Sequence, residues 1–307
     1  MTIFVEQNII PFASPSAIGS NLPFPLPRLL AGGKYSGCLY PESSSLHIWG
    51  GGLTKSVAIS GVRDASFGNS HILVLMRSGN ILSVGADDFR QCSGMSTHFD
   101  SFDSLKDVDG NQRGDLRERT VKVVAGVRHS AVISEQGEVT LYGEDKNHML
   151  RVWKPQDAAV VEVRCGLRHV VALDSLGRVW SWGSNKHGSL GRCLAGESDD
   201  PGLVEGLSSD VRWVGVASGW SHCIVKGIRL DGSVVFAGWG RADMGQLPWA
   251  GDALSEAAMP VHDLLPLPHG TLIDVWAAGE SSYGADELGH LWATGWNDHG
   301  MIYCDYN

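Results

Sequence analysis

The chain has 307 residues, of which 43% are hydrophobic, so it has enough apolar material for a substantial globular core. Its 24 basic and 34 acidic residues give a formal net charge of −10, and no run of Lys and Arg forms a stripe for phosphates. We therefore expect no direct binding of nucleic acid.

The N-terminal sequence MTIFVEQNIIPFASPS has no basic segment before its apolar stretch and carries Glu6 within it. Nowhere do eighteen apolar residues follow one another. The six cysteines lie far apart and form no CxxC pair, which argues against a disulfide framework or a zinc site. We expect a soluble monomer in the cytoplasm, the nucleus or both, with no membrane contact, cofactor or metal.

Taken in chain order, residues 1–30 contain a short apolar segment, TIFVEQN, followed by a proline-rich loop. Residues 31–303 then show six copies of one pattern. The first copy, AGGKYSGCLYPESSSLHIWG, is weak, with Ser36 fourteen residues before Gly50. The last, AAGESSYGADELGHLWATG, is also weak, with Ser282 thirteen residues before Gly295.

The four middle copies contain the motif G-x-x-H, followed by an apolar run, a turn glycine and a second apolar run that ends in glycine. Fourteen residues separate the histidine from this last glycine in three copies, and the fourth has a four-residue insertion. The histidine and final glycine pairs are His71 and Gly85, His129 and Gly143, His169 and Gly183, and His222 and Gly240.

Each copy predicts a short antiparallel meander, with strands joined by the G-x-x-H corner and by glycine turns. A single meander is only marginally stable in water, so the copies must pack face to face. Radial repetition of such sheets gives an all-β propeller of four-stranded antiparallel blades. We interpret 1–307 as one propeller domain.

The pattern is clearest from Cys165 to Gly191, and between Leu30 and Tyr303 it resembles the repeat of the regulator of chromosome condensation family. The resemblance implies a seven-bladed ring. Because six units are legible, we expect an irregular or incomplete closing blade, to which residues 1–30 contribute. The charged stretch from Ser93 to Thr120 is predicted to be a surface loop between blades.

The sequence contains no G-x-S-x-G, H-E-x-x-H, P-loop or kinase motif, so we expect a binding protein and not an enzyme. The four G-x-x-H histidines are predicted to have a structural role at the corners, since equivalent positions of a repeat lie on different blades. The glycines that end each unit, Gly295 included, are predicted to be structural as well.

Trp49, Trp182 and Trp239 precede the glycine that ends their units, so they are predicted to pack between sheets. Other tryptophans fall in corners or loops, where a rigid aromatic ring can anchor a partner. Together with nearby charged residues they define a predicted binding face on the last two complete units. Its members are Trp220, Asp243, Trp249, Trp296, Asp298 and His299.

Two functions are compatible with the resemblance. Within the family, the subgroup of the fungal alpha-tubulin suppressor type is similar in length, acidity and the loop GWNDHG. It implies a scaffold for a small metal-binding electron carrier in diphthamide synthesis and wobble-uridine tRNA modification. The alternative is guanine-nucleotide exchange on a small GTPase of the nuclear-transport type, although no basic tail or identifiable β-wedge is present. A chromatin-associated adaptor is a further alternative of the interaction class.

Overall fold

The computed structural model describes residues 27–53, 56–92, 97–99, 120–143, 151–247, 259–264, 271–288 and 290–296. It divides into two compact units, the first ending at Val160 and the second beginning at Val161. Within these ranges the secondary structure is almost entirely β, with one turn of 3-10 helix, η2, at Lys186–Gly188. No helix among the described residues has the length and hydropathy needed to cross a bilayer.

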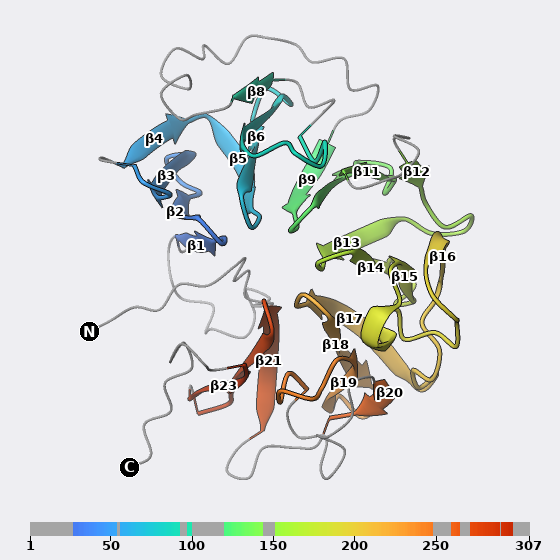
Figure 1. The fold of residues 1–307 in the computed structure, drawn as a ribbon. Coiled ribbons are helices and arrows are strands. Elements are labelled where there is room, and N and C mark those ends of the chain that lie inside the picture. The colour runs from blue at the N-terminus through green and yellow to red at the C-terminus, as the bar shows by residue number, and fades with distance from the viewer. Residues whose placement is uncertain are drawn as a thin grey trace. The chain divides into compact units, whose positions relative to one another are not determined.

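Unit 1 contains three sheets, which we call blades 1 to 3 and which follow one another in chain order (Figure 1). Blade 1 consists of β1 (Arg28–Ala31), β2 (Tyr35–Tyr40), β3 (Ser45–Gly50) and β4 (Val57–Ser60). Blade 2 consists of β5 (Val62–Phe67), β6 (His71–Met76), β7 (Ile81–Gly85) and β8 (Thr97–Phe99). Blade 3 consists of β9 (Thr120–Ala125), β10 (His129–Ser134), β11 (Val139–Gly143) and β12 (Arg151–Trp153).

Unit 2 contains blades 4 to 6. Blade 4 consists of β13 (Val160–Cys165), β14 (His169–Asp174), β15 (Val179–Gly183) and β16 (Ser198–Leu203). Blade 5 consists of β17 (Val211–Ser218), β18 (His222–Arg229), β19 (Val234–Gly240) and β20 (Met259–Asp263). Blade 6 contains three described strands, β21 (Leu272–Ala278), β22 (Ser281–Asp286) and β23 (Leu291–Gly295).

The predicted all-β fold of antiparallel blades is confirmed, with one local exception: β8 pairs with β7 in parallel. This strand lies inside the 93–120 stretch that we predicted to be a loop. The described residues form six sheets and include no seventh. Of residues 1–30, which we assigned to the closing blade, 28–30 belong to β1 and pair with β2 in blade 1, and 1–26 lie outside the described residues.

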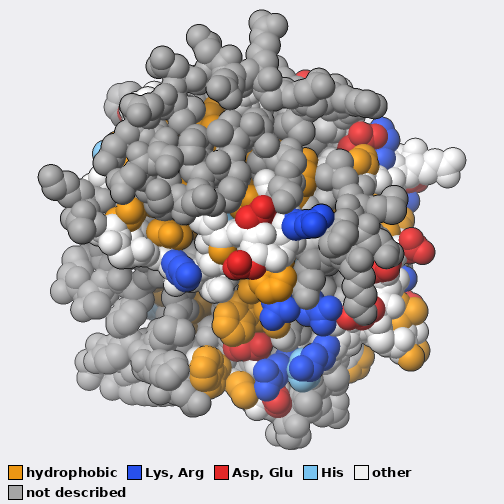
Figure 2. Space-filling model, turned by 45° about the horizontal axis from the view of Figure 1, so that its top comes forward, with side chains coloured by type: hydrophobic (Ala, Val, Ile, Leu, Met, Phe, Trp, Pro, Cys, Tyr) orange, Lys and Arg blue, Asp and Glu red, His pale blue; other side chains and the backbone are white. Residues whose placement is uncertain are grey.

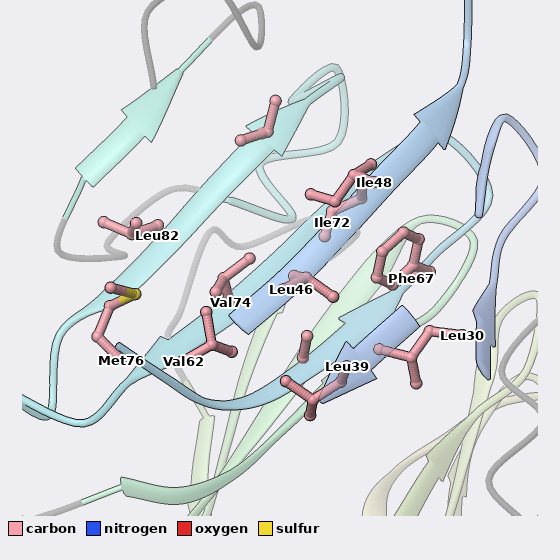
Figure 3. Packing of buried hydrophobic residues seen from close by; sticks show 12 residues of the cluster. Leu30, Leu39, Leu46, Ile48, Val62, Phe67, Ile72, Val74, Met76 and Leu82 are labelled. Atoms are coloured by element: carbon pink, nitrogen blue, oxygen red, sulfur yellow. The ribbon is translucent and has the colours of Figure 1, made fainter. Parts of the chain in front are cut away.

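The second strand of a blade is most deeply buried in blades 2 and 4. All six residues of β6 and all six of β14 are buried. Such strands carry nearly continuous apolar runs, unlike strands with one solvated face. Figure 3 shows the packing in blades 1 and 2, where Leu39, Phe67 and Val74 come from β2, β5 and β6.

Two of the three tryptophans that precede a unit-ending glycine are buried as predicted. Trp239 is completely buried, and its indole N–H donates to the carbonyl oxygen of Ser189 at 3.0 Å. Trp182 is also buried, but Trp49 is 38% exposed. The prediction is wrong for Trp49 because β3 points Leu46 and Ile48 into the core, whereas no described strand covers the face with Trp49.

The register of the two weak repeats differs from the one we predicted. Tyr35 pairs with Gly50, and Ser281 pairs with Gly295, so Tyr35 and Ser281 occupy the position of the corner histidine. The four-residue insertion of the fourth strong copy lengthens a hairpin. β18 and β19 have eight and seven residues, compared with six and five for β14 and β15.

Candidate partner-binding site

The G-x-x-H corner joins the first and second strands of a blade. The glycine N–H donates to the histidine carbonyl at 2.8 Å between Gly68 and His71, and at 3.0 Å between Gly219 and His222. The imidazole folds back over the glycine, so that a Cβ added to Gly219 would lie 2.2 Å from the ring of His222. Glycine is therefore required at the first corner position.

Three corner histidines contact the next blade of their own unit. In each case the contacted residue directly follows the corner position of that blade. His71 Nε2 lies 2.8 Å from Ser130 Oγ, and His222 Nε2 lies 2.8 Å from Ser282 Oγ. His169 Nε2 lies 3.2 Å from Cys223 Sγ. These side chains join successive blades. Burial lowers the pKa of His222 to about 3, against an opposing hydrogen bond to the Ser281 backbone, so the ring is neutral at physiological pH.

The glycine that ends the third strand fixes the following loop against the corner. Gly240 has a φ of 101° and pairs directly with His222, and a Cβ at this position would lie 2.5 Å from the Ser221 carbonyl oxygen. The same carbonyl accepts a hydrogen bond of 2.9 Å from the N–H of Arg241. Corner and loop therefore lie together at one end of each blade, which we call the corner rim.

Glu280 is the centre of the corner rim in blades 5 and 6. Its side chain is only 8% exposed and accepts hydrogen bonds from Ser221 Oγ at 3.1 Å and Gln246 Nε2 at 2.9 Å. The guanidinium of Arg241 lies 3.7 Å from Glu280 and donates two bonds to Asp243, at 2.7 and 3.2 Å. The hydrogen bond from Arg241 holds the pKa of Asp243 below its ordinary value, and the same bond raises the pKa of Arg241.

Three of the predicted binding residues lie around Glu280. Trp220 precedes Ser221, and its backbone donates to Gly279 at 2.6 Å and accepts from Leu167 at 3.0 Å. Trp296 donates its backbone N–H to the Glu280 carbonyl at 2.9 Å. The structure thus places Trp220, Asp243 and Trp296 on one rim of two successive blades. Trp249, Asp298 and His299 lie outside the described residues.

The central residues of this site, Glu280, Arg241 and Gln246, are absent from the sequence-based prediction. A signal for Glu280 was available in the sequence, because it occupies the same corner position as Ser221 and Arg168, directly before the histidine position. Glu280 was missed because the register predicted for the weak sixth copy was displaced by one residue. We name Arg241, Asp243, Gln246 and Glu280 the Glu280 network.

The loop after the third strand also presents large side chains at its tip. Met244 is 40% exposed in blade 5, next to the Glu280 network. In unit 1 the equivalent residue of blade 2, Phe89, is 38% exposed and lies 4.7 Å from the guanidinium of Arg128 on the blade 3 corner. Arg90 follows with a φ of 59°, where the loops of blades 4 and 5 have Gly188 and Gly245. The tips offer apolar contact area beside charged corners.

Charges of both signs occur together on the face shown in Figure 2, where Lys and Arg side chains lie beside Asp and Glu and between hydrophobic patches. The site in unit 2 combines tryptophans, one guanidinium and two carboxylates. Such a set binds by packing, ion pairing and hydrogen bonding, as in the hot spots of protein interfaces.

Comparison with known sequences confirms the repeat. Two profiles of the regulator of chromosome condensation (RCC1) repeat match residues 177–225 and 160–189, which include parts of blades 4 and 5. The corner, the buried histidine and the positive-φ glycine described above lie in these segments. The chain is therefore an all-β protein of the propeller class that carries RCC1 repeats.

The chain is similar to the secretion-regulating guanine nucleotide exchange factor of Bos taurus, with 25% identity over 281 residues, 80% of this chain and 58% of the relative. It is 31% identical to the regulator of chromosome condensation of Mus musculus over 144 residues, 43% of this chain and 33% of the relative. The human probable E3 ubiquitin-protein ligase HERC6 is 29% identical over 230 residues, 68% of this chain and 20% of the relative. The chain thus spans less than two thirds of the length of each.

Solved structures show the same fold. Prp20p from Saccharomyces cerevisiae has a TM-score of 0.64 at 18% identity, covering 88% of this chain and 72% of the relative. Human WBSCR16 has a TM-score of 0.60 at 19% identity, covering 78% and 64% of the respective chains.

Proposed function

We propose that this chain is a non-catalytic interaction scaffold that binds a protein partner through the corner rim of blades 5 and 6. The Glu280 network is the observation that carries this proposal, because it orders two tryptophans, an exposed methionine and three charged groups on one rim. Preordered aromatic and arginine side chains bind with little loss of conformational entropy.

Two further features support a partner at this rim. The indole nitrogen of Trp220 is buried and has no hydrogen-bond partner, an arrangement that a small rotation toward a partner's carbonyl oxygen would relieve. The side chain of Met244 is exposed and adaptable, and methionine fits apolar partner surfaces of varied shape.

The first partner class is a small metal-binding electron carrier, which would place the chain in diphthamide synthesis and wobble-uridine tRNA modification. Its support is the similarity of the loop GWNDHG to the fungal subgroup; this loop begins at Gly295, next to the site. The relatives described above are not of this kind, so the proposal depends on the loop and on the site beside it.

The second partner class is a small GTPase of the nuclear-transport type, on which the chain would promote nucleotide exchange. Its support is that relatives are named guanine nucleotide exchange factors. In addition, the study of Prp20p describes binding of that protein to Gsp1p and histones. A partner of either class can be accommodated by an aromatic rim with charges of both signs.

One experiment separates the two classes. The purified chain is mixed with a fluorescent-GDP-loaded GTPase of the nuclear-transport type and, separately, with a small zinc or iron carrier protein, and release and binding are followed. Accelerated GDP release that is lost in Trp220→Ala supports exchange. Saturable binding of the carrier that is lost in the same variant supports the scaffold. Binding that survives Trp220→Ala and Trp296→Ala together would exclude the corner rim of blades 5 and 6 as the site.

A further inference from the structure

The hairpin between β18 and β19 projects a hydrophobic tip at the end of blade 5 opposite the corner rim. Leu230, in its turn, is 100% exposed, and Ile228 at its base is 39% exposed. Turn positions ordinarily carry polar residues or glycine. In unit 1, the equivalent turns of blades 2 and 3 carry Arg77 and Ser78, and Glu135 and Gln136.

The tip is rigid, because the two added residues on each strand continue the ladder up to the turn. The Arg229 N–H donates to the Ser233 carbonyl at 3.0 Å, and the Gly232 N–H donates to the Arg229 carbonyl at 3.0 Å. Ser233 donates its N–H to Asp231 Oδ1 at 2.8 Å. A fully exposed leucine on such a turn is available for contact with little further ordering of the backbone.

Acidic side chains surround this tip. The guanidinium of Arg229 lies 3.8 Å from Asp210 and 3.9 Å from Asp263, whose side chains are 64% and 68% exposed. Asp231 in the turn also interacts electrostatically with Arg229, so three carboxylates lie near the tip, against Arg229 and Arg212, the cross-strand partner of Ile228. Hydrogen bonds from Ser208 and Ser233 hold the pKa values of Asp210 and Asp231 below the ordinary value, so both stay ionised in mild acid.

We propose that the β18–β19 tip is a second docking surface, for a protein segment that presents apolar side chains flanked by Lys or Arg. The carboxylates around Leu230 outnumber the nearby cations, so charge complementarity favours a segment of this kind. A second copy of this chain, whose net charge is −10, would be repelled, and so would an anionic membrane. The surface is separate from the corner rim, so it does not depend on the function proposed there.

The test uses three synthetic peptides of about 18 residues with helical periodicity: one of leucine and lysine, one of leucine and glutamate, and one of lysine and serine. Binding to the full chain is measured by fluorescence anisotropy. The Leu/Lys peptide should bind, and Leu230→Ser should weaken it about tenfold or more. Asp263→Asn together with Asp210→Asn should weaken it and reduce its dependence on salt.

The matched control is Leu176→Ser. Leu176 is 57% exposed in the equivalent turn of blade 4, but the carboxylate beside it, Asp174, is buried and paired with Arg178 at 2.7 Å. It should leave binding of the Leu/Lys peptide unchanged. Thermal unfolding of Leu230→Ser and of Leu176→Ser should match the wild type, because both leucine side chains are exposed.

Several results would overturn the proposal. Equal binding of the Leu/Glu or the Lys/Ser peptide would show that the tip does not select both properties. If Leu230→Ser bound the Leu/Lys peptide with unchanged affinity, the tip would not be the binding site of this peptide. Dimerisation of the chain, or binding to vesicles of phosphatidylcholine with phosphatidylserine, that is abolished by Leu230→Ser would assign the tip to a second copy or to lipid instead.

Discussion

The imidazole of His222 on blade 5 lies 2.8 Å from the hydroxyl of Ser282 on blade 6, and both side chains are completely buried. His71 and Ser130 repeat this contact at the same distance in unit 1. The strongest sequence motif of the chain therefore encodes a bond between successive blades, which supports the structural interpretation of these histidines.

Ser282→Ala should lower the free energy of unfolding by about 1 to 3 kcal/mol, because it leaves a buried imidazole without this partner. Ser130→Ala should have a similar effect in unit 1. Chemical denaturation measures both. Ser60→Ala, at an exposed position of β4, is the control and should change little. Equal stability of Ser282→Ala and the control would show that the contact contributes nothing.

Gly240→Ala should destabilise the fold by roughly 2 to 4 kcal/mol, since it combines a positive φ with a Cβ 2.5 Å from a carbonyl oxygen. Gly232 offers a matched comparison, because its φ is 85° but no atom lies within 4 Å of an added Cβ. Gly232→Ala should cost about 1 kcal/mol. Urea titration of both variants checks the difference, and similar losses would contradict the proposed clash.

The corner histidines and the glycines that end each unit are the residues from which most of the fold can be predicted. His222 and Gly240 are cross-strand partners, so a nearly constant spacing between such pairs predicts hairpins and their register. Where serine or tyrosine replaces histidine, the predicted register was displaced by one residue. The exposure of Trp49 could not be predicted, because it depends on which neighbouring sheet covers its face.

The candidate site was only half predictable. Trp220 and Trp296 are identifiable from residue type and loop position. Glu280 is not, because its importance comes from Ser221, Arg241 and Gln246, which converge on it from another blade. Such a contact between residues 34 or more positions apart leaves no local pattern in one sequence.

The carboxyl of Asp274 should make stability depend on pH. Burial raises its pKa to about 6, against the opposing charge of Lys226 at 3.7 Å. Because the folded state binds the proton more tightly than the unfolded state, this contribution is present below about pH 4 and is lost as the pH rises through 6. Its full size is about 3 kcal/mol.

Asp274→Asn removes this titration. The stability of the variant relative to the wild type should therefore increase between pH 4 and pH 6.5, as measured by urea unfolding across the range. The matched control is Asp263→Asn, at an exposed position, which should show no such trend. A constant difference between Asp274→Asn and the wild type would mean that Asp274 titrates normally.

We propose that the corner rim of blades 5 and 6 binds a protein partner. The most direct test is equilibrium binding of the small metal carrier and of the GTPase to the wild type, Trp296→Ala and Leu176→Ala, with thermal unfolding of the same samples. Our account predicts that Trp296→Ala weakens binding of one partner by about 2 kcal/mol or more with folding intact, whereas Leu176→Ala has no effect. Unchanged binding, or a collapse of thermal stability in Trp296→Ala, would contradict it.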